Sequence, residues 1–174
     1  MSNLTKIAFA NSLKNELNKK DINKITIEEI AEDVGVNRKT FYYHFSDIYS
    51  LIEWIYENEV IDELKKPEYE NDWKKAYKFI TGYILKNKKF IMKTYKLSEL
   101  NTFIFNQTCS LIKKKIDEKN FDITEKEKIF LARFYSHAIV GILIDWVNSG
   151  MIDLPDKIIE NIDKAIRKYI DIES

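Results

Sequence analysis

The sequence predicts an all-α protein with a small N-terminal helical domain over residues 1–46 and a larger helical domain over residues 47–174. Gly (4) and Pro (2) are scarce, which disfavours loop-rich β architectures. Hydrophobic residues make up 45% of the 174 residues, enough for a sizeable core, and they recur at helical spacing. We therefore expect about nine helices in total.

The first expected helix runs from Leu4 to Leu17. It stops before the polar stretch of residues 18–24. Its apolar residues lie at intervals that place them on one face of an amphipathic helix. They are Leu4, Ile7, Ala8, Ala10, Leu13 and Leu17.

A short second helix is expected to begin at Ile27. Thr26 is a favourable N-cap residue, and Glu29 follows three positions later, as in a capping box. Gly35 stands where a residue in the left-handed conformation would end the helix. The expected buried face consists of Ile27, Ile30, Ala31 and Val34.

A third short helix, Arg38 to Phe45, follows a tight turn. Asn37 is a good N-cap residue, while Phe41 and Phe45 anchor the helix on its inner side. Two short helices joined by such a turn predict a helix-turn-helix over residues 26–45.

Longer helices are expected in the rest of the chain. One runs from Asp47 to about Lys66, connects the two domains and ends near Pro67. Apolar periodicity predicts others near residues 71–86, 88–96, 98–119, 124–149 and 155–170. Because the helix near 124–149 is apolar over more than one stripe, we expect a partner to cover part of it.

Charge gives no general support for nucleic-acid binding, because 28 basic residues balance 28 acidic ones. Residues 1–47 are balanced as well. Any contact with DNA must therefore come from a local group of side chains.

The outward positions of the third short helix carry such a group. The second helix of a helix-turn-helix enters the major groove, where the planar fork of Arg38 can grip a guanine edge or a phosphate. Lys39 and Thr40 suit bases or the DNA backbone, and Tyr42 and His44 suit phosphate. The expected DNA-binding residues are Thr26, Asn37, Arg38, Lys39, Thr40, Tyr42, Tyr43 and His44.

The alternative is a helical hairpin with a solvated polar face. Two adjacent tyrosines, Tyr42 and Tyr43, beside Arg38 and Lys39 weigh against it, since a solvated face rarely needs them.

The run from Ile25 to Phe45, ITIEEIAEDVGVNRKTFYYHF, closely resembles the DNA-binding signature of TetR/AcrR-family regulators. With the flanking helices, the resemblance covers about a third of the chain. It implies a three-helix DNA-binding head, a connecting helix, and a C-terminal domain that dimerises and often binds a small-molecule effector. Two residues depart from the pattern: Lys39 replaces a small residue, and Ile48 replaces a lysine that often meets phosphate.

A second resemblance concerns the segment from Trp146 to Met151, followed by Pro155. It is similar to the end of the family's penultimate helix, where the last two long helices pair across a two-fold axis. This implies a homodimer through the helices near 124–149 and 155–170. The expected function is a sequence-specific regulator, a repressor, that binds a palindromic operator in double-stranded DNA.

Two other classes of function compete with that of a DNA-binding regulator. An enzyme is disfavoured because the chain lacks a phosphate-binding glycine loop and a His-Glu-x-x-His motif. Cys109 and His137 could in principle form a nucleophile and base, but nothing in the sequence brings them together, and a buried structural cysteine is the better account. The second alternative is a TetR-fold co-regulator with weak or no DNA binding of its own, which the neutral head and Ile48 favour.

No cofactor, metal or membrane span is expected. A single cysteine fits a reducing compartment, the N-terminus lacks a secretory pattern, and the longest apolar run, Ala138–Ile144, is far short of the ~20 residues that cross a bilayer. We therefore expect the protein to be located in the cytoplasm. Aromatic residues of the larger domain are more often core than the lining of an effector pocket, so no effector-binding residue is assigned.

Overall fold

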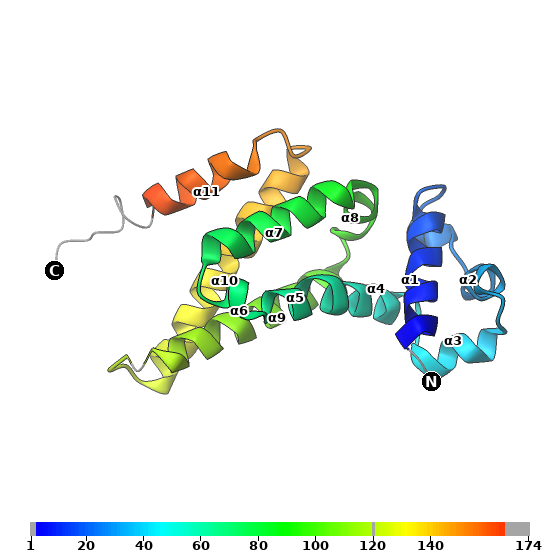
Figure 1. Ribbon diagram of the computed structural model, residues 1–174, viewed down its shortest axis with the longest axis horizontal. Helices are drawn as coiled ribbons and strands as arrows, with labels where there is room; N and C mark the ends of the chain where they lie inside the picture. Colours follow the sequence, from blue (N-terminus) through cyan, green and yellow to red (C-terminus); the bar gives the residue numbers. More distant parts are fainter. Residues whose placement is uncertain (1–2, 120, 166–174) are drawn as a thin grey trace. The chain divides into compact units, whose positions relative to one another are not determined.

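A computed structural model describes residues 3–119 and 121–165 (Figure 1). Helices and turns make up these residues, with no strand among them, so the all-α prediction is confirmed. Parts of the predictions lie outside the described residues: residues 1–2 of the predicted domain 1–46, and residues 120 and 166–174 of the predicted domain 47–174, which include residues 166–170 of the predicted last helix.

The chain divides into two compact units. Unit 1 comprises Met1–Asp62 and Asn87–Thr108, and unit 2 comprises Glu63–Lys86 and Cys109–Ser174. The elements are α1 (Asn3–Leu17), η1 (Ile22–Lys24), α2 (Ile27–Val34), α3 (Arg38–His44), α4 (Ile48–Tyr56), η2 (Glu57–Ile61), α5 (Asp62–Leu64), α6 (Pro67–Glu70), α7 (Trp73–Lys86), α8 (Lys88–Thr94), α9 (Ser98–Glu118), α10 (Glu125–Asn148) and α11 (Pro155–Lys164).

The predicted signals around α2 are confirmed. Thr26 and Glu29 form a capping box, and Gly35 ends the helix in the left-handed conformation at φ 75°. That conformation favours glycine because a side chain there would be strained. The helix boundaries are therefore fixed by residues within one turn of each end.

The head formed by α1, α2 and α3 surrounds a small apolar core. Its side chains come from all three helices and are completely buried. They include Phe9, Leu13, Ile30 and Phe41. Each of these helices would be unstable alone, and burial of these side chains holds the three together.

The connecting helix differs from its prediction. A π-helical turn, η2, follows α4, and Pro67 begins α6 instead of merely ending the helix before it. The physical reason for the π turn is the spacing of buried residues: Ile55 and Tyr56 precede Val60 and Ile61 by five positions, and a π turn brings residues five apart onto one face. Proline suits the first turn of α6 because its missing N–H has no helical partner there.

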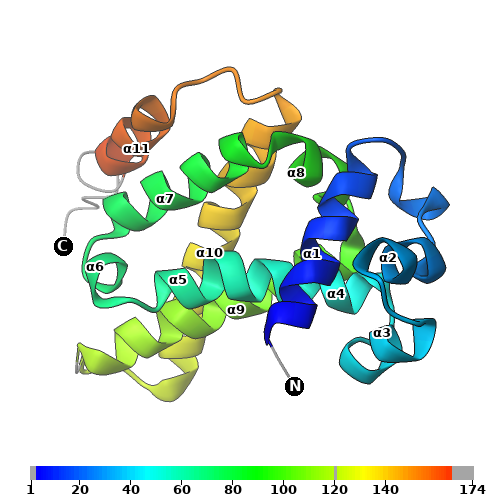
Figure 2. The same cartoon turned by 45° about the vertical axis from the view of Figure 1, so that its right-hand side comes forward.

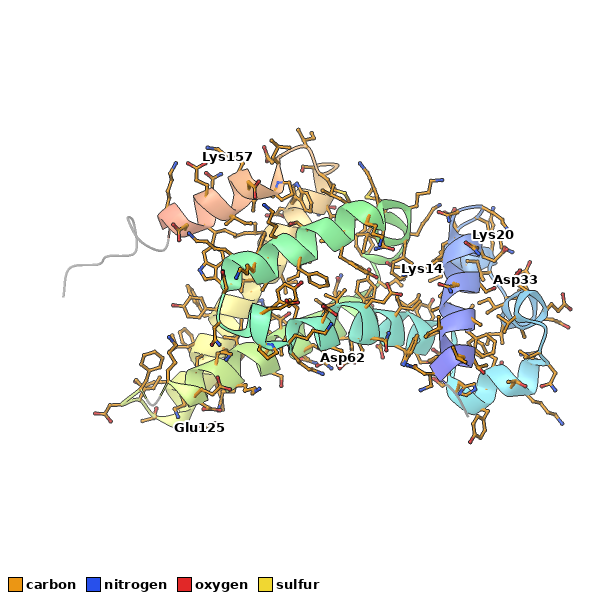
Figure 3. All side chains as sticks on the ribbon, in the orientation of Figure 1. Lys14, Lys20, Asp33, Asp62, Glu125 and Lys157 are labelled. Carbon is orange, nitrogen blue, oxygen red and sulfur yellow. The ribbon has the colours of Figure 1, made fainter. Side chains whose placement is uncertain are left out.

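Within unit 1, α8 packs against α1 of the head (Figure 2), and its Phe90 ring lies 5.4 Å from that of Tyr56 at the end of α4. The buried Tyr56 hydroxyl shares a hydrogen bond of 2.9 Å with the Thr94 hydroxyl. Lys14, labelled in Figure 3, joins α1 to η2 through an ion pair with Glu59. Lys93 of α8 forms an ion pair with Asp21.

In unit 2, α11 lies along α7. Lys74 pairs with Asp163 at 2.9 Å and Lys78 with Asp156 at 3.1 Å. At the end of α10, Gly150 and Met151 both have positive φ, and the Trp146 indole N–H donates to the Asp153 carbonyl at 2.9 Å. This turn lets α11 begin shortly after α10 ends.

Candidate nucleic-acid interface

The orientation of α3 is set by Phe41. Its side chain is completely buried, with its ring centroid 5.2 Å from that of Phe9 and 5.7 Å from that of Phe45. Because Phe41 faces inward, Tyr42 and Tyr43 at the next two positions face away from the core. They are 46% and 75% exposed.

Arg38 and Tyr42 contact each other on this outer face. The Arg38 Nη2 donates a 2.9 Å hydrogen bond to the Tyr42 hydroxyl, and the guanidinium carbon lies 5.4 Å from the Tyr42 ring centroid. The hydrogen bond to Tyr42 raises the pKa of Arg38, which stays charged at any physiological pH. Lys39 is exposed beside Arg38, so two cations start the helix.

Asn37 and Thr40 bond to each other. The Asn37 Oδ1 accepts the backbone N–H of Thr40 at 3.0 Å and the Thr40 hydroxyl at 3.2 Å. These bonds satisfy an N–H that the start of a helix otherwise leaves unpaired. Both residues therefore fix the beginning of α3.

Thr26 is engaged in the same way at the start of α2. Its hydroxyl accepts the Glu29 N–H at 3.2 Å, while its own N–H donates to the Glu29 carboxylate at 2.9 Å. Lys20, labelled in Figure 3, and Thr26 lower the pKa of Glu29 to about 2, so this carboxylate is charged. The negative charge at the first turn of α2 opposes an approaching phosphate.

His44 ends α3 and is half-buried. Its ring lies 6.2 Å from that of Phe9 and 5.1 Å from that of Tyr43. Burial, and next the charge of Lys6, lower the pKa of His44 below its usual range. The imidazole is therefore neutral near pH ~7.

Lys6 is a cation of this surface that sequence reasoning missed. Its Nζ lies 5.7 Å from the Phe45 ring centroid and 5.8 Å from that of Trp54. Ring contacts hold the ammonium of α1 close to the end of α3. No local pattern reveals this proximity, since Lys6 and His44 are far apart in sequence.

Tyr49 is a second residue that sequence reasoning missed. It lies exposed in the first turn of α4, next to the half-buried Ile48. The Tyr49 hydroxyl thus lies one position after Ile48, and Ile48 stands where the family pattern often has a lysine. Its signal in the sequence is an aromatic residue two positions after a helix N-cap, Asp47.

Unit 1 also contains an open cavity of about 490 Å³ between α4 and α9. Glu53 lines it, and burial followed by the charges of Asp47 and Glu99 raises the pKa of Glu53. The other lining residues are Ser98, Glu99, Thr102, Phe103 and Asn106. Among the described residues of this cavity, Phe103 contributes the single aromatic ring.

Two family descriptions match the chain. "Bacterial regulatory proteins, tetR family" matches residues 14–55, and "Transcriptional regulator C-terminal region" matches residues 71–168. A curated relative, the HTH-type dhaKLM operon transcriptional activator DhaS of Lactococcus lactis subsp. lactis (strain IL1403), is 25% identical over 152 residues. The match covers 84% of this chain and 81% of the relative.

Solved structures share the fold. The dihydroxyacetone kinase operon activator DhaS superposes with a TM-score of 0.72 at 22% identity, covering 95% of this chain and 98% of that one. NalD, the secondary repressor of the MexAB-OprM multidrug efflux pump in Pseudomonas aeruginosa, gives 0.62 at 18% identity, covering 94% and 97%.

Proposed function

The chain belongs to the TetR family of transcriptional regulators, and we propose that it binds its DNA operator as a homodimer through the outer face of α3. It is a DNA-binding regulator and not an enzyme. The observation that carries the proposal is the exposure of Arg38, Lys39, Tyr42 and Tyr43 on α3, while Phe41 of the same helix is buried in the head core. A recognition helix must present donors in this way to reach base edges in the major groove.

Each side chain has a separate task in this proposal. Arg38 reads a base edge, while Lys39 and Tyr43, one helical turn apart, meet phosphates. His44 and Lys6 add donors at the end of α3. Thr26, Asn37 and Thr40 act mainly through the helix starts that they cap, since their side chains already hold those bonds.

The exposed apolar face of α10 supports the homodimer. Phe130 and Phe134 are 66% and 52% exposed, and their rings stack with centroids 6.4 Å apart. Ile129, Tyr135 and Ile142 extend the apolar face. Exposing these five large apolar side chains to water is costly unless a partner covers them. We therefore expect a second copy to pack there with its own α10 and α11.

The length and composition of α10 also meet the minimum for a membrane span, the single described helix that does so. Arg133 and Asp145 lie along it, and charged side chains are expensive inside a bilayer. These charges favour a protein partner over lipid. We therefore expect the protein to act in the cytoplasm, together with the DNA that it binds.

A two-fold dimer predicts a palindromic operator, because the two heads present identical surfaces to half-sites about one helical turn apart. DhaS is an activator and NalD a repressor by name, so related folds serve both outcomes. We expect repression where the operator overlaps a promoter. The cavity lined by Glu53 is the candidate binding site for a small-molecule effector.

Selection of duplexes from a random-sequence DNA library with the purified chain tests this function. The proposal predicts recovery of one palindromic sequence that the protein binds in preference to a shuffled duplex. Recovery of no preferred sequence at low salt would contradict it and favour the co-regulator alternative.

A further inference from the structure

Tyr42 occupies an unusual position between the head core and Arg38. Its ring meets the buried Phe41 edge-on, with centroids 5.9 Å apart and planes at 87°. Its hydroxyl accepts the hydrogen bond from Arg38, and the same ring lies under the guanidinium. A chain of contacts therefore runs from Phe9 and Phe41 in the core through Tyr42 to Arg38 at the surface.

The contact restricts a side chain that would otherwise move freely. A free arginine loses much rotamer freedom when it binds, and fixing it beforehand reduces that cost. The guanidinium has five N–H donors, of which the bond to Tyr42 uses one. The remaining donors suffice for a two-point contact with a guanine edge.

We propose that Tyr42 is a positioning residue, which holds Arg38 in the orientation that reads a base edge. Sequence selectivity at the base pair read by Arg38 then depends on Tyr42, although Tyr42 itself reads no base. This inference rests on the proposed function of the α3 face. It differs from a phosphate contact by Tyr42, which would strengthen binding to every sequence alike.

The test compares two duplexes: the one recovered by the wild-type chain from the random library, and a shuffled duplex of the same composition. The measured quantity is the selectivity ratio, which is the dissociation constant of the shuffled duplex divided by that of the selected duplex. Arg38→Ala lowers this ratio by about tenfold or more. Tyr42→Phe keeps the ring and removes the hydroxyl, and lowers the ratio by about two- to tenfold, the range of one exposed hydrogen bond.

The double variant provides the decisive comparison. If Tyr42 acts through Arg38, adding Tyr42→Phe to Arg38→Ala lowers the ratio no further. Tyr43→Phe is the matched control. The proposal assigns the Tyr43 hydroxyl to a phosphate and not to Arg38, so its removal should weaken binding to both duplexes equally and leave the ratio unchanged.

Two results overturn the inference alone: an equal loss on both duplexes for Tyr42→Phe, or effects of the two substitutions that add in the double variant. A wild-type chain without any preferred duplex overturns the proposed function and the role of Tyr42 together. Unchanged thermal unfolding of Tyr42→Phe separates both cases from misfolding.

Discussion

Truncation of Phe134 tests the dimer face of α10. The ring is 52% exposed, so about 100 Å² of a ~200 Å² side chain is uncovered in one protomer. In a two-fold dimer Phe134→Ala removes this area twice. At ~25 cal/mol per Å² the loss is at most about 5 kcal/mol, and because area converts only partly into affinity, we expect about 2–4 kcal/mol. The dimer should dissociate about 30- to 1,000-fold more readily.

Sedimentation equilibrium over a nanomolar-to-micromolar concentration range measures this change. Phe121→Ala is the matched control, because Phe121 is 51% exposed but lies outside α10, and it should leave the dimer intact. Far-UV circular dichroism should show that the Phe134→Ala monomer keeps its helices. A monomeric wild type at micromolar concentration, or equal dimer affinity for wild type and Phe134→Ala, would refute the reasoning.

Three further changes probe the head. Phe41→Ala opens a cavity in its core and should lower the free energy of unfolding by about 3–5 kcal/mol in urea denaturation; a loss under ~1 kcal/mol would contradict its central place. Because the pKa of Glu29 is lowered to about 2 from 4.5, its stabilising bonds to Thr26 and Lys20 are present above pH 4.5 and lost as pH falls toward 2. The difference in unfolding free energy between the wild type and Glu29→Gln should therefore shrink as the pH falls from 4.5 toward 2. A difference that stays constant would argue against a stabilising role of the charged carboxylate. The lowered pKa of His44 means that acidification below pH ~6.5 charges the ring and should tighten DNA binding, whereas His44→Gln should lack this part of the pH dependence in fluorescence anisotropy.

Features set by neighbouring residues could be predicted from the sequence. Thr26, Gly35 and Asn37 act on backbone groups within a few positions, so the boundaries of α2 and α3 follow from local chemistry. The uncovered apolar face of α10 was likewise expected, because it follows from periodicity alone.

Features set by distant contacts could not be predicted in this way. The π turn depends on burial of Tyr56, whose hydroxyl meets Thr94 from α8. Lys6 reaches the end of α3 only because α1 packs across it. The Arg38–Tyr42 bond could have been predicted from the sequence, since the two residues are one helical turn apart, but the same spacing also allows each side chain to contact DNA separately.

The salt dependence of binding to the selected duplex tests the central claim most directly. If α3 contacts DNA, the logarithm of the association constant should fall steeply and linearly with the logarithm of salt concentration. Lys39→Ala removes one phosphate contact from each protomer and should then reduce the slope by about two, while the exposed Lys126→Ala of α10 should leave it unchanged. A flat wild-type slope, or the same slope for wild type and Lys39→Ala, would contradict contact through this face.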